Sequence, residues 1–486
     1  MPEQIKKQLA KNTIWNALER FSLLGVQLIC TFILARFLKP DDFGIIGMLI
    51  VFTTISNTII DSGFVQTLIR EKDVSEREYS SVFYFNVFVV IIIYIILYFC
   101  SPYIADFYHQ PILNGVCKLT FLVIPANALC LVQNAILMRN IQFKKICIAT
   151  IIASVTSSVI AIFLAYYFRN VWALVVQNVV TYVLKAIMLW IMTGWIPKLY
   201  FSISVIKKYF SFSKNLLISG LIGNIFNNIY SIVIGRYYTA TDLGFYMQAD
   251  RIKNVASMST TSVIQNVTYP ILSKVNNNGG NIKDAYRKII ATTVVFVGFI
   301  MALLMCVSCD LFEVLMGNYI WRVSGTYLFI LSISGLLFPL HAINQNILLV
   351  KGDSKSILRL EIIRRITMIV ILLITLHYDI IIFISGTAIY SFLLLFLNLH
   401  FCGKPINYSV FQQLKDVSPI FFRIGIMITI TLLISRLYSN MDLMYRTFLT
   451  LLLAIIIGLI VFWRNASFKE TIVLLQSLFR FKKNAA

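Results

Sequence analysis

Long apolar runs alternate with short polar segments along almost the whole chain. About 20 apolar residues cross the hydrocarbon core of a bilayer as an α-helix. The pattern therefore predicts an all-α polytopic membrane protein with about fourteen spans, at 13–37, 43–69, 80–100, 117–138, 146–168, 171–193, 211–237, 243–270, 287–309, 324–350, 357–377, 379–401, 418–437 and 443–463. Basic residues at both ends predict amphipathic segments at 1–12 and 464–486 that lie on the membrane.

The second half of the chain repeats landmarks of the first half. Three landmarks recur in order at offsets of 203, 200 and 212 residues: Lys11-Asn12 at Lys214-Asn215, Arg36 at Arg236, and Gln133-Asn134 at Gln345-Asn346. A repeat period of about 200 residues is too long for a solenoid and fits a duplicated membrane bundle. We predict an N-terminal six-helix bundle at 13–193, a cytoplasmic linker at 194–210, a C-terminal six-helix bundle at 211–401 and two additional helices within 418–463.

Composition and charge agree with a membrane protein. The chain is 59% hydrophobic and 13% charged, whereas soluble domains carry roughly 25% charged residues. A net charge of +21 on a soluble chain would indicate a nucleic-acid partner. Here most basic residues lie in the short loops of one side, where they set topology, so we expect no nucleic acid. The positive-inside rule then places both termini in the cytoplasm.

Polar side chains recur on one face of three predicted spans. They are Asn16 and Glu19, with Arg20 beside them; Asn224 and Asn227, with Asn228 beside them; and Asp250, Asn254, Ser257 and Gln265, with Arg251 beside them. A polar stripe on a membrane helix faces away from lipid, which predicts a shared hydrated seam. Helix packing through small and amide side chains is the alternative, and the sequence leaves both open.

Ionisable side chains inside the predicted spans indicate function. A charge at the bilayer centre costs roughly 3 kcal/mol on insertion scales, so it normally faces a wet cavity. Basic groups inside spans include Arg20, Lys185, Arg251, Arg364 and Arg365. Glu361 precedes the last two at helical spacing, so a helix ion pair is an equal alternative there. Pro125 and Pro339 interrupt equivalent spans of the two halves, as tolerated kinks or as hinges.

The motifs that would indicate an enzyme or a metal site are missing from the sequence. Cys306 and Cys309 have CxxC spacing but no second pair and no nearby histidine, so we expect packing rather than redox or metal chemistry. The chain contains no P-loop, HExxH or nucleophile elbow, and no loop is long enough for a soluble catalytic domain. We therefore expect a secondary-type transporter rather than an enzyme.

Several short motifs carry a resemblance to a known family: Lys11-Asn12-Thr13, Ala35-Arg36-Phe37-Leu38 with Phe43-Gly44, Ile234-Gly235-Arg236-Tyr237-Tyr238 with Leu243-Gly244-Phe245-Tyr246, and Asp250-Arg251-Ile252. Over roughly residues 5–465 the chain resembles the oligosaccharide (O-antigen, Wzx-type) flippases of the multidrug/oligosaccharidyl-lipid/polysaccharide exporter superfamily. It is most similar to the lipopolysaccharide biosynthesis or colanic-acid exporter branch. The resemblance implies two six-helix bundles in a V, with two further helices beside a lateral groove.

The resemblance also implies a function. Such proteins move a polyprenyl-diphosphate-linked oligosaccharide from the inner to the outer leaflet of the bacterial cytoplasmic membrane. The five buried bases would then line a cationic cavity for the diphosphate, and the amide and hydroxyl stripes would meet the glycan. We expect no bound cofactor. Glu19, Asp61 and Asp250 are candidates for proton or sodium coupling, although Asn228 stands where some relatives have an acidic residue. Membrane lipid and polysaccharide polymerase or assembly proteins are the expected partners.

Two other functions remain open. An ion-coupled multidrug exporter of the same superfamily would need net acid in its cavity, whereas buried base outnumbers acid here. A membrane glycan polymerase or ligase would need a long outer loop with catalytic arginine or histidine, and the longest outer loop is 101–116.

Overall fold

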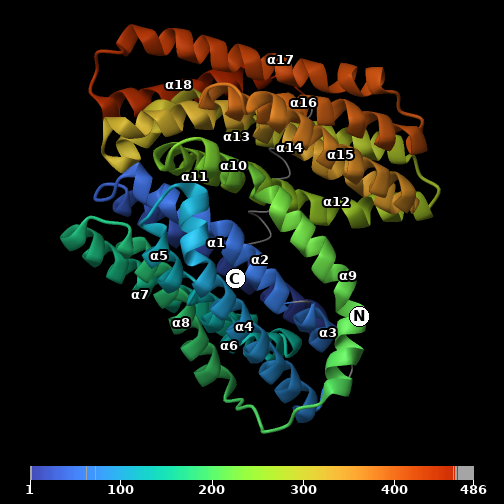
Figure 1. The fold of residues 1–486 in the computed structure, drawn as a ribbon. Helices are drawn as coiled ribbons and strands as arrows, with labels where there is room; N and C mark the ends of the chain where they lie inside the picture. The colour runs from blue at the N-terminus through green and yellow to red at the C-terminus, as the bar shows by residue number, and fades with distance from the viewer. Residues whose placement is uncertain (1–2, 62, 72, 464, 466–467, 469–486) are drawn as a thin grey trace. The chain divides into compact units, whose positions relative to one another are not determined.

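The structure is a computed structural model that describes residues 3–61, 63–71, 73–463, 465 and 468. The predicted tail at 464–486 lies outside these residues apart from Asn465 and Phe468. Every regular element within the described residues is a helix, which confirms the all-α class (Figure 1). The chain divides into two compact units, one up to Gly244 and one from Phe245 onward.

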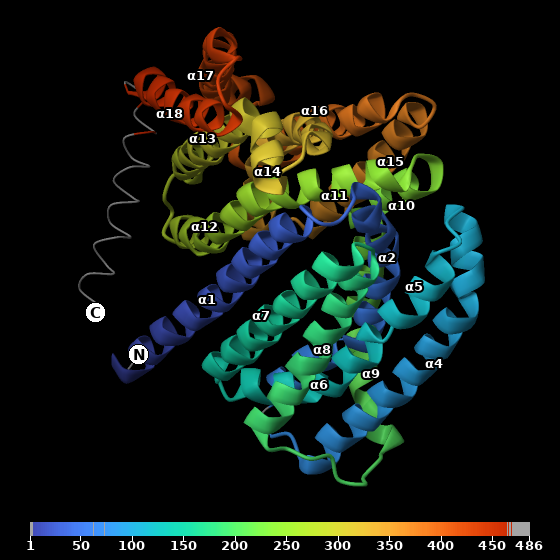
Figure 2. The same ribbon diagram turned by 90° about the vertical axis from the view of Figure 1, so that its left-hand side faces the viewer.

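Among its described residues, the first unit contains ten helices and the start of an eleventh. They are α1 (Glu3–Leu34), α2 (Pro40–Asp61), α3 (Phe64–Arg70), α4 (Glu76–Tyr108), α5 (Leu113–Thr120), α6 (Val123–Arg139), α7 (Phe143–Phe168), α8 (Trp172–Thr193), α9 (Ile203–Asn227), α10 (Ile229–Tyr237) and α11 (Ala240–Asn254). Helix α7 packs between α1 and α8, and α6 packs against α8 and α4 (Figure 2). Helix α9 packs against α2, α3 and α4.

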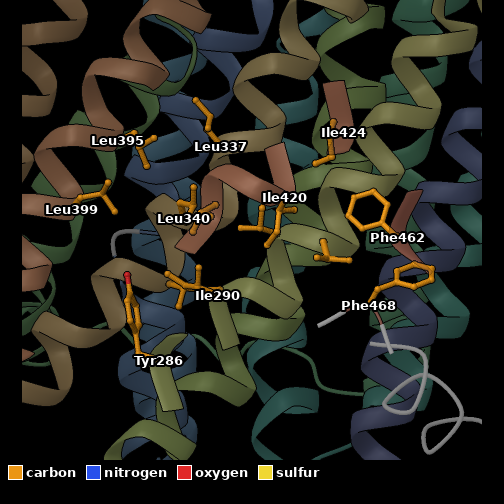
Figure 3. Close-up of a cluster of buried hydrophobic side chains, with 14 of the residues drawn as sticks. Tyr286, Ile290, Leu337, Leu340, Leu395, Leu399, Ile420, Ile424, Phe462 and Phe468 are labelled. Carbon is orange, nitrogen blue, oxygen red and sulfur yellow. The ribbon is translucent and has the colours of Figure 1, made fainter. Parts of the chain in front are cut away.

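The second unit continues from α11 to the C-terminal helices. Its elements are the π-helix η1 (Val255–Ser259), α12 (Thr260–Asn277), α13 (Ile282–Met316), η2 (Tyr319–Trp321), α14 (Arg322–Lys351), α15 (Ser354–Thr375), α16 (Ile380–Gly403), η3 (Lys404–Ile406), α17 (Val410–Ser435), η4 (Arg436–Tyr438) and α18 (Leu443–Phe462). Its core gathers around α13 and α14, where Tyr286, Leu340, Ile420 and Phe462 pack together (Figure 3). The predicted bundle boundary at 194–210 stays a prediction. The two compact units divide later, after Gly244, so α9 and α10 belong to the first unit.

Helices occupy all fourteen predicted spans, but fewer qualify as membrane-length apolar helices. Within the described residues there are ten, or up to eleven if the bent pair α9 and α10 forms one span. Two of the spans that do not qualify have physical reasons: the region of α11 and α12 is interrupted by η1, and α15 carries Arg359, Glu361, Arg364 and Arg365 in one stretch. In α1, Phe21–Leu34 is a shorter apolar helix.

The repeated landmark sequence gives a repeated local structure in the first unit. Asp42 accepts a 2.9 Å hydrogen bond from the Lys39 N–H. Asp242, at the same place in the second copy, accepts from the Thr239 hydroxyl at 2.6 Å. In both copies the aspartate therefore stabilises the start of a helix by binding a donor three residues earlier.

The glycine that follows each of these aspartates is required by a close helix contact. A Cβ on Gly44 would lie 1.8 Å from the carbonyl oxygen of Ala240, and a Cβ on Gly244 would lie 1.9 Å from the carbonyl oxygen of Pro40. The two contacts are reciprocal between equivalent positions of the repeat. Small residues allow such approach of helix backbones in membranes.

Breaks near Asn228 and Gly63 interrupt helices of the first unit, and the two predicted hinge prolines lie at different places in their helices. The break at Asn228 bends α9 against α10 by 45°. Between α2 and α3, Gly63 adopts φ +73°, in the left-handed region that glycine tolerates. Pro125 lies in the first turn of α6, where its missing N–H removes no helical bond. Pro339 lies buried in the interior of α14, where it does remove one.

Candidate functional site

Helix α2 makes side-chain hydrogen bonds to two neighbouring helices of the first unit. The Asn57 side chain accepts a 3.0 Å hydrogen bond from Asn127 of α6. The neighbouring Thr58 hydroxyl accepts from the Asn224 amide of α9 and donates to the Thr54 carbonyl. A Cβ on Gly220 would lie 2.9 Å from the Thr58 methyl group, so the glycine allows this approach. Asn224 therefore makes the interhelical packing contact that the sequence left as the alternative.

The other asparagines of this stripe have different surroundings. Asn228 lies at the break between α9 and α10, and its side-chain nitrogen donates to the Asn224 carbonyl at 2.8 Å. The same carbonyl also accepts from the backbone N–H of Asn228 at 3.2 Å, so Asn228 ends α9 with both groups on one acceptor. Asn227 is exposed. The predicted row of three thus divides into a packing contact, a helix-ending contact and an exposed amide.

The predicted charged groups of the first unit lie on three helices. Glu19 of α1 accepts a 3.2 Å hydrogen bond from Thr150 of α7. Lys185 of α8 is half-buried and lies close enough to Cys130 to interact with it electrostatically. Asp61 ends α2 and forms hydrogen bonds with the Gln66 side chain and the Val65 backbone across the break. The side chains of Arg20 and Asn16 lie outside the described parts of α1.

In the second unit, Asp250 is held by two side chains of its own helix. Its carboxylate lies 2.6 Å from the Lys253 ammonium and accepts a 2.7 Å hydrogen bond from Asn254. Arg251 is half-buried on the same helix. The sequence analysis did not assign Lys253 to the site, although its spacing of three residues from Asp250 is the signal for a helical ion pair.

The lower part of this stripe binds α14. The Ser257 hydroxyl donates to the Gly335 carbonyl at 2.6 Å. The Gln265 side chain donates to the Ala342 carbonyl at 3.0 Å, and Asn346 donates back to the Gln265 carbonyl at 3.2 Å. These are helix-packing contacts, the alternative that the sequence left open for Ser257 and Gln265.

The arginines of α15 form the expected helical ion pair and extend it to a neighbouring helix. Glu361 lies 2.6 Å from Arg365 and 3.5 Å from Arg364. Arg364 also donates to Asn398 of α16, whose amide lies 3.1 Å from Nδ1 of His341 on α14. A buried polar network therefore joins three helices. Its arginines and Glu361 were singled out from the sequence, and Asn398 was not.

Two ionic clusters lie at the ends of the spans. On the side predicted to be outer, Asp310 of α13 makes a two-pronged contact with Arg446 of α18 at 2.7 and 2.8 Å, and Arg322 of α14 lies 3.4 Å away. On the side predicted to be inner, Lys208 lies 3.2 Å from Glu71, and this hydrogen bond raises the pKa of Lys208. None of these residues was assigned to a site from the sequence.

The helical architecture is shared with known membrane proteins. The structure matches lipid II flippase MurJ in an inward closed conformation with a TM-score of 0.69 at 14% identity, over 92% of this chain and 98% of that one. It matches an inward-facing MATE-family multidrug transporter with a TM-score of 0.59 at 12% identity, over 82% and 100%. The fold is therefore that of polytopic flippases and multidrug transporters.

The sequence assigns the chain more narrowly. It belongs to the polysaccharide biosynthesis protein family, whose model matches residues 33–326, which confirms the resemblance drawn from its motifs. Teichuronic acid biosynthesis protein TuaB of Bacillus subtilis is 25% identical over 72% of both chains. Succinoglycan biosynthesis transport protein ExoT of Rhizobium meliloti is 23% identical over 68% of this chain and 67% of that protein. Lipopolysaccharide biosynthesis protein WzxC of Escherichia coli is 21% identical over 68% of both.

Proposed function

We propose that this protein is a flippase that moves a polyprenyl-diphosphate-linked oligosaccharide from the inner to the outer leaflet of the bacterial cytoplasmic membrane. The product would serve surface polysaccharide or lipopolysaccharide assembly. The observation that carries the proposal is the family match over residues 33–326, which includes the charged helix α11. A relative named as a transport protein and a lipid II flippase of the same fold support it.

The chemistry of the cargo agrees with the basic residues inside the predicted spans. A diphosphate loses its hydration in a medium of low dielectric constant and needs charge-assisted hydrogen bonds in return. Guanidinium groups supply them in a planar fork that fits phosphate oxygens. We assign this role to Arg251 and Arg20, with Lys185, Arg364 and Arg365 as further bases. Alternating access would move the diphosphate past these groups, with Pro125 and Pro339 as hinge positions.

The coupling ion is proposed to be a proton or Na⁺. Among Glu19, Asp61 and Asp250, the described contacts favour Asp61. Its Oδ1 is buried and makes no hydrogen bond within the described residues, so an ion or a proton would satisfy it. Asp250 instead has a lysine and an amide as neighbours.

A multidrug exporter is the second candidate, because a MATE-family transporter shares the fold. A cationic drug would need uncompensated acid in its path. On α11 the ammonium of Lys253 compensates Asp250, and on α15 two arginines compensate Glu361. These contacts favour an anionic cargo.

Substitution of Arg251 tests the proposal. We expect Arg251→Ala to abolish export of surface glycan while the protein still inserts into the membrane, and Arg251→Lys to retain part of it. Arg436→Ala, on an exposed arginine at the end of α17, is the matched control. Deletion of the protein should leave a lipid-linked glycan on the inner leaflet, which mass spectrometry of extracted lipid would identify. Export at the wild-type level with Arg251→Ala would remove this residue from the mechanism.

Both termini are proposed to lie in the cytoplasm, from the distribution of basic loops. A cysteine in place of Asp242, at the start of α11, should then react with a membrane-impermeant thiol reagent added to intact spheroplasts. The parent chain without Asp242→Cys is the control. Reaction from the cytoplasmic side alone would reverse the topology.

A further inference from the structure

An apolar groove lies in the first unit beside the bend between α9 and α10. It has a volume of about 350 Å³, within the range of small-ligand sites. Helix α2 contributes Phe52 and Ile55, α4 contributes Cys100 and Phe107, and all the other lining side chains are aliphatic or aromatic. Such a surface fits a hydrocarbon chain and offers almost nothing to a polar ligand.

The groove has a buried floor and an exposed rim. On α4, Ile104 and Tyr108 are buried, whereas Tyr103 is 75% and Phe107 is 44% exposed. Gly235 allows the close approach of α10 to α4, because a Cβ there would lie 2.9 Å from the Tyr108 ring. The groove is therefore a built trough that is open along one side.

The groove covers part of one leaflet. Its lining runs from Cys100 to Tyr108 on α4 and from Ile225 to Ile232 across the bend between α9 and α10, which is about 10–12 Å at 1.5 Å per residue. This is less than half of a hydrocarbon core of ~30 Å. Phe107 lies next to the last residue of α4, so the groove begins at the membrane face that the charge pattern predicts to be outer.

A basic pair stands at the outer end of this trough. Nη1 of Arg236 donates to the Phe107 carbonyl and contacts Nε2 of His109, and the guanidinium lies 5.1 Å from the centre of the Phe107 ring. Arginine has no acceptor, so in this contact the guanidinium is the donor and Nε2 of His109 the acceptor. Both contacts use Nη1 of a guanidinium that has five N–H donors in a planar fork suited to phosphate.

We propose that this trough is an outer-leaflet site for a polyprenyl diphosphate, with its isoprenoid chain in the groove and its diphosphate on Arg236 and His109. The proposal rests on the proposed flippase function and adds to it a binding site for the delivered lipid. Charge complementarity favours this occupant, because a lipid here must match an apolar trough and a basic end. A diphosphate carries more negative charge than the phosphodiester of a membrane phospholipid, and the trough holds the part of the isoprenoid chain next to it.

A natural cysteine provides the test. Cys100 lines the groove and is half-buried, and Cys309 is the one other free cysteine of the described residues that is not buried. The full chain with Cys309→Ser would be placed in phosphatidylcholine nanodiscs and treated with N-ethylmaleimide, and peptide mass spectrometry would follow alkylation of Cys100. We expect C55 polyprenyl diphosphate, at about ten times its dissociation constant, to slow alkylation about ten-fold.

Two variants separate the headgroup contact from the groove. Arg236→Gln should remove most of the protection by lipid while leaving alkylation without lipid unchanged, and Arg436→Gln is the matched control that should keep protection. Ile55→Trp fills the groove from α2 and should reduce protection with Arg236 intact, which keeps the test valid if Arg236→Gln fails to fold. Thermal unfolding of each variant would establish folding.

The source of the ligand is distinguished by two further probes. Inorganic diphosphate should give no protection, because it has no chain for the groove. Equal protection by phosphatidylglycerol would mean a general anionic-lipid site, and protection by diphosphate alone would mean an anion site; either result overturns the proposal.

If wild-type protein supports export and polyprenyl diphosphate leaves Cys100 unprotected, the groove assignment fails while the flippase function stands. If deletion leaves glycan export unchanged, the flippase function fails, and Cys100 protection still decides the groove.

Discussion

The hydroxyl of Ser257 donates its hydrogen bond to the carbonyl oxygen of Gly335, over a distance of 2.6 Å. In an uninterrupted α-helix that carbonyl accepts from the N–H of residue 339, but residue 339 is proline and has no N–H. Ser257 belongs to the π-helical turn η1, and both Ser257 and Gly335 are buried. The irregular turn of one helix thus satisfies the carbonyl that proline leaves open in its neighbour.

Removing this hydroxyl should destabilise the second unit in a way that depends on Pro339. Ser257→Ala leaves the Gly335 carbonyl buried without a donor, and we expect the free energy of unfolding to fall by about 1 kcal/mol. An alanine at 339 brings back the N–H. We therefore expect Ser257→Ala combined with Pro339→Ala to lose less than the sum of the two single losses. Thermal unfolding of the purified variants in one detergent would measure the cycle. If the losses of the two single variants simply add, the Ser257 hydroxyl does not compensate for the missing N–H of Pro339.

The reciprocal glycine contact predicts a steep difference between two similar substitutions. Gly44→Ala would place its Cβ 1.8 Å from the Ala240 carbonyl oxygen, so helix α2 would have to move. We expect loss of more than about 3 kcal/mol or failure to accumulate in the membrane, since forcing extra atoms into packed sites costs roughly 1–3 kcal/mol even when the clash is milder.

Gly223→Ala is the control for that experiment. Gly223 lies within α9 and has nothing within 4 Å of its added Cβ. Alanine is the better helix former by about 1 kcal/mol, so this variant should be as stable as the parent or slightly more stable. Membrane-inserted protein and the midpoint of thermal unfolding would be compared. Equal behaviour of the two variants would mean that α2 and the start of α11 do not depend on the close approach.

The overall class and the repeat were predictable from the sequence because they rest on averages over long stretches. Membrane-length apolar runs need no knowledge of neighbours, and the landmarks around Arg36 and Arg236 keep their order. The glycines at 44 and 244 were quoted as motif residues. Their reason, a backbone contact between the two copies, depends on which helices meet, and the sequence does not contain that information.

The candidate site was less predictable for the same reason. A polar stripe on α11 and α12 predicts that this face avoids lipid, but it cannot distinguish a wet cavity from a neighbouring helix. Ser257 and Gln265 bind α14. The ion pair of Glu361 with Arg365 follows helical spacing and was expected, whereas Asn398 comes from another helix and left no local signal.

The pairing of Asp250 with Lys253 predicts a compensating double variant. Asp250→Asn leaves an ammonium without its partner in a partly buried site, and Lys253→Gln leaves a carboxylate in the same condition. Each single change should reduce the amount of folded protein, because breaking a buried pair costs roughly 3–5 kcal/mol at full burial and less here. The double variant should recover towards the parent level, as measured by fluorescence-detected size-exclusion chromatography.

Glycan export in the same cells separates structure from coupling. If Asp250 carries the coupling ion, the double variant folds but does not export. If the pair is structural, export recovers together with folding. A double variant that folds no better than either single change would contradict the ion pair itself.

The contact of Asp310 with Arg446 predicts that both the planar geometry and the charge of the guanidinium stabilise the packing of α18 against α13. Two nitrogens of Arg446 reach the two carboxylate oxygens at 2.8 and 2.7 Å, and both side chains are about 18% exposed. Lysine keeps the charge but cannot make the two-pronged contact.

We expect Arg446→Ala to lower the free energy of unfolding by about 2–3 kcal/mol, and Arg446→Lys to lie between that value and the parent. Arg436→Ala, at an exposed arginine on the same predicted side, should change it by less than about 0.5 kcal/mol. The measurement is thermal unfolding at low and high salt: a partly buried pair is screened weakly, so a loss for Arg446→Ala that disappeared in high salt would identify a surface contact instead.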